Sequence, residues 1–164
     1  MKFNTKTIHG GQAPDRAYAS VMPPIYQTST YAQTTPGGHK GYEYSRTHNP
    51  TRHALEQSFA SIENGDYGLA FGSGLAAIDA IIKLLSPGDE VISTNDLYGG
   101  TYRLFTKVFE KFQIKFHFVG MENISEIEKN ITTKTKLIWV ETPTNPMLNI
   151  IDIKAVSSIA KKYN

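Results

Sequence analysis

Apolar residues recur at helical spacing from about residue 50 onward and lack a sustained period before it. Leu55, Phe59 and Ile62 fall at i, i+4 and i+7, which places them on one face of a helix. An Asn-Gly pair follows, and it is a typical helix end because glycine adopts left-handed φ angles without a Cβ clash. The run GLAAIDAIIKLL, residues 74–85, predicts a second helix that is apolar nearly all round and therefore deeply packed.

Short apolar runs alternate with these helices. They predict strands at 67–71, 90–94, 114–119 and 136–141, with further helices at 100–112, 123–131 and 151–163. This alternation predicts an α/β fold in which helices cover both faces of a mostly parallel sheet. Ligands of such sheets bind at the carboxyl ends of the strands, so the residues that follow each strand are candidates for a functional site.

The first 48 residues differ from the rest, because they are rich in Thr, Tyr, Gly and Pro. So long a stretch without periodic structure is unusual inside a compact domain. We therefore divide the chain into an extended arm, 1–48, which we expect to contact another subunit, and an α/β part, 49–164. The first helix is expected to start after an Asn-Pro pair, with Arg52 and His53 on its surface.

Composition narrows the classes of function. The chain has 164 residues, a net charge of +2 and no clustered basic run, which argues against a nucleic-acid partner. It has no cysteine, so it forms no disulfide, and no apolar run is long enough to cross a membrane. With no secretory signal in view, we expect a cytoplasmic protein without a membrane partner. His48 and His53 lack the helical spacing of metal ligands, and we expect no metal site.

Small residues follow the first predicted strand. In GSGLAA, residues 72–77, the next helix would point free N–H groups and its positive dipole end at an anion, and Ser73 adds a hydroxyl. The spacing G-x-G-x-x-A, built on Gly72 and Gly74 with Asp96 after the next strand, also matches a dinucleotide-binding fingerprint. A Rossmann-type oxidoreductase module therefore stays open at this point, as does a tight turn that binds nothing.

Two more loops after strands carry polar or aromatic groups. Tyr98 precedes two glycines, which leave one face of its ring open to stack on a planar ligand, and Arg103 follows one helical turn later. The loop ETPTNP, residues 141–146, contains two prolines and presents the side chains of Glu141 and Asn145. A rigid polar loop at this edge of the sheet suits the orientation of a ligand.

Taken together, YEYSRTHNPTR, FGSGLAA, DLYGGTYR and VETPTNP closely resemble, in order and separation, motifs of the Cys/Met-metabolism family of pyridoxal-phosphate (PLP) enzymes. This family includes cystathionine γ-synthase, the cystathionine γ- and β-lyases and methionine γ-lyase. The resemblance implies the large domain of an aspartate aminotransferase-like (fold type I) PLP-dependent transferase. It also implies pyridoxal 5′-phosphate as cofactor, a small amino-acid substrate, and a homo-oligomer that is a dimer of dimers.

The resemblance implies two phosphate-binding segments, whose residues are Tyr44, Ser45, Arg46, Ser73, Gly74 and Leu75. Tyr44 and Arg46 are implied to reach the cofactor of a neighbouring subunit, and a guanidinium fork with a phenol suits phosphate. Gly74 and Leu75 are implied to offer backbone N–H groups.

The family's pattern also assigns the remaining site residues. Tyr98 is implied to stack on the pyridine ring, and its phenol to take part in proton transfer as the catalytic group. Asn145 is implied to bind the 3′-oxygen. Glu43, Arg103 and Glu141 match motif positions that we assign to the substrate, and the Glu43 carboxylate could attract the distal ammonium of cystathionine.

Other parts of the family's pattern match no residue of this chain: the pyridinium-binding aspartate, the lysine that carries the cofactor and the arginine that binds the substrate carboxylate. We therefore expect an N-terminal fragment that is inactive by itself. A non-catalytic remnant that only binds PLP or dimerises is a further alternative.

The wording of the motifs bears on the reaction. EYSRTHNPTR speaks against cystathionine β-lyases, and Gly100 stands where methionine γ-lyases typically carry cysteine. We expect γ-elimination from cystathionine or γ-replacement on an O-acyl-homoserine, with a slight preference for the first.

Overall fold

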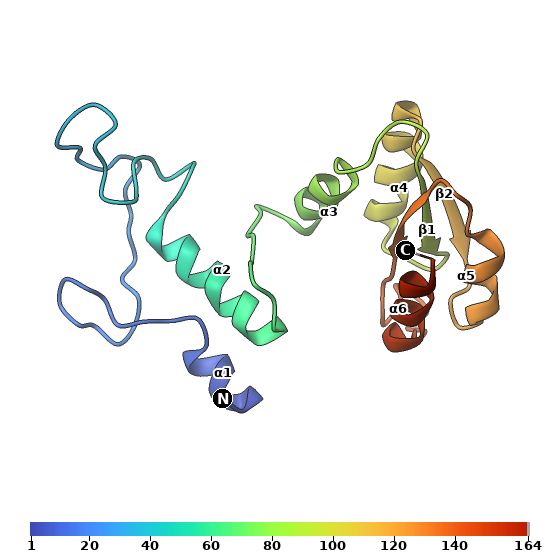
Figure 1. Ribbon diagram of the computed structural model, residues 1–164, viewed down its shortest axis with the longest axis horizontal. Helices are drawn as coiled ribbons and strands as arrows, with labels where there is room; N and C mark the ends of the chain where they lie inside the picture. Colours follow the sequence, from blue (N-terminus) through green and yellow to red (C-terminus); the bar gives the residue numbers. More distant parts are fainter. Residues whose placement is uncertain (164) are drawn as a thin grey trace. The chain divides into compact units, whose positions relative to one another are not determined.

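The computed structural model describes residues 1–163. The chain forms two compact units, residues 1–71 and the part from Gly72 onward, and each is described by itself (Figure 1).

The first unit contains two helices, α1 (Phe3–His9) and α2 (Pro50–Glu63), joined by a long irregular segment. Helix α2 begins as the sequence predicts, because the Asn49 side chain accepts from the backbone N–H of Thr51 at 2.8 Å. It ends at Asn64, which adopts the left-handed conformation with φ 55°. Helix α1 was not predicted, and it packs against α2. The functional division at 48/49 stays a prediction.

The second unit is built on a parallel sheet with strand order β2-β1-β3. Its elements in chain order are α3 (Gly74–Ile82), β1 (Glu90–Thr94), α4 (Gly99–Lys107), the short 3-10 helix η1 (Phe109–Phe112), β2 (Lys115–Val119), α5 (Ile124–Asn130), β3 (Thr135–Trp139) and α6 (Ile153–Lys162). The central strand β1 pairs with both neighbours, and all of its residues are buried.

Separate apolar cores lie on the two faces of this sheet. On one face Phe105 of α4 stacks on Phe116 of β2, with ring centroids 4.4 Å apart, and meets Trp139 edge-on. On the other face, residues of α5 and α6 such as Ile127 and Val156 pack around the sheet. Helices therefore cover both faces of a parallel sheet, and the predicted α/β class is confirmed.

Two local predictions are wrong. Residues 67–71 do not form a strand: the Ala70 N–H is bound by the Glu56 side chain at 3.0 Å, and Leu69 is exposed. The predicted deep packing of the second helix is also absent, because only one face of α3, at Ile78 and Ile82, packs on the core of its unit. Its other face leaves Ile81 exposed.

A buried ionic cluster closes the amino end of the sheet. The Glu90 carboxylate, with the residue only 8% exposed, accepts a hydrogen bond from the Thr132 hydroxyl at 2.9 Å and pairs with His117 Nε2 at 3.0 Å. Burial by itself raises the pKa of Glu90. The hydrogen bonds from Thr132 and His117 and the charge of Lys115 outweigh burial, so the net pKa lies below its ordinary value.

This cluster predicts how stability depends on pH. Because the folded state holds the Glu90 pKa below the ordinary 4.5, its contribution is complete above that value and is lost as pH falls through the folded pKa. We expect Glu90→Gln to lower the free energy of unfolding at neutral pH by about 1 kcal/mol. The variant should also lose less stability than the wild type on acidification, as measured by denaturant unfolding at pH 7 and pH 4. An equal loss in both proteins would contradict this account.

Candidate functional site

The loops that follow β1 and β3 are joined by a carboxylate. Both side-chain oxygens of Glu141 accept from the backbone N–H of Tyr98, at 3.0 Å each. Tyr98 immediately precedes α4 and its residue is 47% exposed. The adjacent pairing of β1 and β3 brings the two loops to the same edge of the sheet, as the rule for parallel sheets predicts.

A second carboxylate orders the loop that carries Asn145. Asp96 accepts a hydrogen bond from the buried Thr144 hydroxyl and another from the backbone N–H of Met147 at 3.0 Å. The Thr144 oxygen in turn accepts from the Asn149 N–H at 2.8 Å. Asn145 is thereby presented, exposed, from a loop with fixed backbone. The dinucleotide alternative needed Asp96 to bind a ribose, and this carboxylate instead belongs to the loop.

The turn before α3 has the geometry of an anion site. Ser73 is the N-cap of α3, and its side-chain oxygen accepts from the Ala76 N–H at 3.1 Å. The backbone N–H groups of Gly74 and Leu75 lie in the first turn, where a helix provides no acceptor for them. A Cβ added at Gly72 or Gly74 would meet no atom within 4 Å, so the turn has room for a ligand. These donors fit the phosphate of PLP.

The ring of Tyr98 lies against a glycine. A Cβ built on Gly100 would stand 2.3 Å from Tyr98 Cε1, a distance that no side chain tolerates without a shift of the ring. Gly100 therefore lies close to the Cε1 edge of the ring, where only a residue without a Cβ is compatible with this ring position. Arg103 folds back toward the start of the same helix, with its Nη1 3.4 Å from a Cβ built on Gly99.

In the first unit, residues 43–46 form an ordered segment. The backbone N–H of Ser45 donates to Ser29 at 2.8 Å, and the Ser45 hydroxyl is enclosed between Thr28 and the Asn49 amide. Tyr44 and Arg46 are exposed, and the Arg46 guanidinium carbon lies 4.9 Å from the Tyr44 ring centroid. Glu43 is also exposed. The predicted phosphate ligands Tyr44 and Arg46 thus lie side by side, while the Ser45 hydroxyl is engaged within its own unit.

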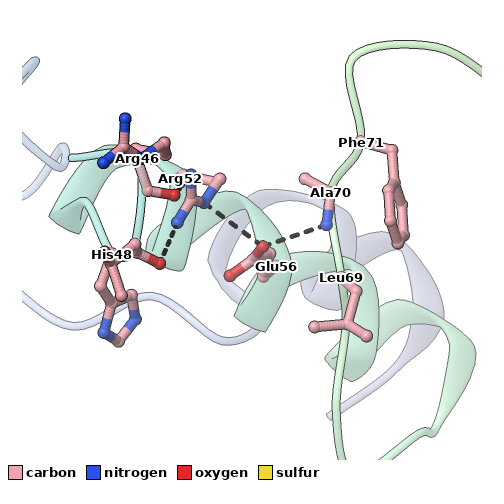
Figure 2. A pocket seen from close by; sticks show the side chains of 8 residues that line it. Arg46, His48, Arg52, Glu56, Leu69, Ala70 and Phe71 are labelled. Atoms are coloured by element: carbon pink, nitrogen blue, oxygen red, sulfur yellow. Dashed lines mark hydrogen bonds and ion pairs between the residues drawn. The ribbon is translucent and has the colours of Figure 1, made fainter. Parts of the chain in front are cut away.

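Arg52 has a role that the sequence analysis missed. Its guanidinium donates to the backbone carbonyls of Ser45, Arg46 and Thr47, at 3.2, 3.5 and 2.6 Å. It also pairs with Glu56 at 3.7 Å, and Glu56 accepts from Ala70 (Figure 2). The sequence analysis placed Arg52 on the helix surface, where its side chain is 33% exposed, but did not predict these contacts. A cation in the first turn of a helix opposes the helix dipole, and this unfavourable placement was the available signal.

A pocket of about 440 Å³ in the first unit is lined by Arg46, Arg52, Glu56 and Ala70 among others. Figure 2 shows Arg52 between the 45–47 backbone and Glu56, with the Arg46 guanidinium pointing away from Glu56. His48, on the pocket wall, lies with its Nε2 3.4 Å from Nδ1 of His53. Within residues 1–163 no group of three or more His, Cys, Asp or Glu side chains is arranged to hold a metal ion.

The family model described as "Cys/Met metabolism PLP-dependent enzyme" matches residues 4–164. The chain belongs to this family. The cofactor of this family is PLP. Nothing in the comparisons favours a Rossmann module.

Named relatives agree with this assignment. The chain is 48% identical over 163 residues to a cystathionine beta-lyase of Coxiella burnetii and 51% identical over 162 residues to a cystathionine gamma-lyase of Bacillus subtilis. A solved structure, metB from Corynebacterium glutamicum, is 46% identical and superposes with a TM-score of 0.94. These matches cover 99%, 99% and 100% of this chain, but 42%, 43% and 43% of the relatives. The chain therefore spans about two fifths of their length.

The relatives bear on the choice of reaction. Proteins named cystathionine beta-lyase match the chain about as well as those named gamma-lyase, so overall identity does not separate the two reactions. Within the described residues, no helix is long and apolar enough to cross a membrane. The individual roles predicted for the site residues stay predictions.

The contacts of Arg52 predict an indirect effect on cofactor binding. Arg52→Met removes the donors to the carbonyls of residues 45–47 but keeps an unbranched apolar stem at this position. We expect this variant of the full-length protein to bind PLP about tenfold more weakly than the wild type does, because the backbone that carries Arg46 loses its charge-assisted hydrogen bonds. Titration of apoprotein with PLP measures this affinity. Arg16→Met, which changes an exposed arginine of the same unit, is the control, and equal affinity in both variants would contradict the prediction.

Proposed function

We propose that the protein to which this chain belongs is a PLP-dependent transsulfuration enzyme. Its proposed reaction is γ-elimination from cystathionine or γ-replacement on an O-acyl-homoserine. Bound PLP supplies an electron sink for charge that develops on the amino-acid substrate. The observation that carries this proposal is the ordered edge of the sheet, where hydrogen bonds join the loop that holds Tyr98 to the loop that holds Asn145. The chain is also 51% identical to a cystathionine gamma-lyase.

The proposed phosphate site combines donors from two neighbouring subunits. At α3, Gly74 and Leu75 contribute backbone N–H groups, and the positive end of the helix dipole favours the anion. The Ser73 oxygen already accepts from Ala76, so its hydroxyl proton is available to the phosphate. Tyr44 and Arg46 contribute a phenol and a guanidinium from a neighbouring subunit, and their exposure in the first unit supports an intermolecular role.

The proposed ring and substrate contacts come from the remaining residues. Tyr98 stacks on the cofactor ring with its exposed side chain, and its phenol holds or transfers a proton near the substrate. Asn145 donates to the 3′-oxygen from its fixed loop. Glu43 and Arg103 contact the substrate, with Glu43 positioned by charge to attract an ammonium group.

Assembly and location form part of the proposal. Action of Tyr44 and Arg46 in trans needs at least a dimer, and we propose a dimer of dimers from the family resemblance. The absence of cysteine from the sequence agrees with a cytoplasmic location. The chain contains no residue that matches the family's cofactor-bearing lysine, so we propose that these 164 residues do not turn over substrate alone.

β-Elimination is the second candidate reaction. It is favoured by the relatives named cystathionine beta-lyase, which are 48% and 50% identical to this chain. The two cleavages differ in products: cleavage at the γ-carbon releases cysteine, 2-oxobutanoate and ammonia, whereas cleavage at the β-carbon releases homocysteine, pyruvate and ammonia.

Product analysis tests the proposal directly. We expect the purified full-length protein to carry a visible PLP absorption band and to release cysteine and 2-oxobutanoate from cystathionine. Incubation with an O-acyl-homoserine and cysteine checks for γ-replacement. Homocysteine and pyruvate would favour the second candidate. PLP binding without any of these reactions would leave the non-catalytic alternative, and absence of PLP would overturn the proposal.

Arg46 predicts a mutational signature. Arg46→Ala should weaken PLP binding about tenfold or more, because a charged partner of the phosphate is lost, while unfolding of the subunit stays near that of the wild type. Arg46→Lys should retain part of the affinity, since an ammonium keeps the charge without the fork. Arg16→Ala serves as the control for removal of an exposed arginine.

Mixed oligomers test whether Arg46 acts in trans. Subunits with Arg46→Ala and subunits with Tyr98→Ala are each expected to be impaired. Co-expressed, they should form hybrids in which one site combines an intact Tyr98 with an intact Arg46 from the neighbour. Recovery of activity in purified hybrids supports the intermolecular site. Failure of an assembled hybrid to recover any activity would place both residues in one subunit.

A further inference from the structure

We propose that Glu141 is a positioning residue that fixes Tyr98 for stacking, and that it does not bind the substrate. This inference rests on the proposed function, because it takes Tyr98 as the residue that stacks on PLP. It replaces the substrate role that the motif comparison suggested for Glu141.

The first observation is the geometry of the carboxylate. Both oxygens of Glu141 lie 3.0 Å from a single donor, the Tyr98 N–H, although the two residues are 43 positions apart. The contact joins the end of β3 to the loop after β1, so it fixes the backbone of Tyr98 relative to the sheet. A carboxylate with both oxygens directed at this donor is poorly placed to receive a substrate ammonium.

The second observation concerns the start of α4. Tyr98 is the N-cap residue of this helix and makes no side-chain capping bond, and the first turn of α4 contains no acidic residue. A negative charge near the N-terminus of a helix is stabilising. Glu141 supplies that charge from another strand. The side chain therefore serves the junction between the loop and α4, and it does so without a ligand.

The third observation concerns the ring of Tyr98. Gly100 lies close to one edge of this ring, where an added Cβ would stand 2.3 Å from Cε1 and 2.9 Å from Cζ. Glu141 holds the backbone of Tyr98, and the missing Cβ at Gly100 leaves the space that the ring occupies. Preorganisation of this kind lowers the entropy cost of stacking on a planar ligand. Removal of either constraint should therefore affect the cofactor before any substrate binds.

The test uses the full-length holoprotein without substrate. We expect Glu141→Ala to change the visible circular dichroism of bound PLP and to weaken PLP binding about tenfold, the loss of one charge-assisted hydrogen bond. Glu141→Gln keeps one acceptor oxygen and should fall between Ala and wild type. Glu110→Ala removes an exposed carboxylate from η1 and should leave both measurements unchanged.

Gly100→Ala provides an independent arm, because it displaces the ring while Glu141 stays intact. It should change the same dichroism band, and Glu141→Gln decides the role of the carboxylate if Glu141→Ala fails to fold. An unchanged band in Gly100→Ala would contradict the fixed position of the ring.

The outcomes separate this inference from the proposed function. A wild-type protein that binds no PLP overturns the proposed function and this inference with it. A wild-type band that is unchanged in Glu141→Ala, together with a raised KM, would make Glu141 a substrate ligand and overturn the inference alone. A changed band and weaker PLP binding in both Glu141→Ala and Gly100→Ala support it.

Discussion

The parallel pairing of β1 with β2 and β3 is the constraint on which the second unit depends. Strand β1 is buried along its whole length and pairs with both neighbours. Its Val91 lies opposite Phe116 of β2 on one side and Leu137 of β3 on the other. Because all strands run the same way, their carboxyl ends meet at one edge. Every predicted ligand of the second unit that follows a strand, Tyr98 and Asn145 included, lies in a loop from that edge.

Two carboxylates convert this shared edge into a fixed arrangement. Asp96, after β1, holds the loop that follows β3, and Glu141, after β3, holds the residue that follows β1. The two contacts run in opposite directions between the same pair of strands, so each loop is ordered by the other. The opposite end of the sheet has its own ionic cluster at Glu90, which keeps stability and ligand binding at separate ends.

The sequence predicts the elements of the chain well where an apolar run is buried within the sheet, and less well where it has no neighbouring strand. The strand at 90–94 is correct to the residue because it is buried throughout. The run at 67–71 has similar apolarity, but its Ala70 amide binds Glu56, a contact that composition does not reveal. The uses of Asp96 and Glu141 were missed for the same reason, since each joins residues more than 40 positions apart.

The two arginines near the start of α2 show how neighbouring cations divide their tasks. Arg52 directs its donors at the carbonyls of residues 45–47, and so holds the backbone on which Arg46 stands. Arg46 lies exposed beside the Tyr44 ring, with its guanidinium turned away from Glu56. A phosphate ligand needs a fork that is exposed and already oriented, because ordering a long side chain on binding costs entropy. Arg46, the proposed phosphate ligand, meets this requirement, and the contacts of Arg52 hold the backbone that carries it.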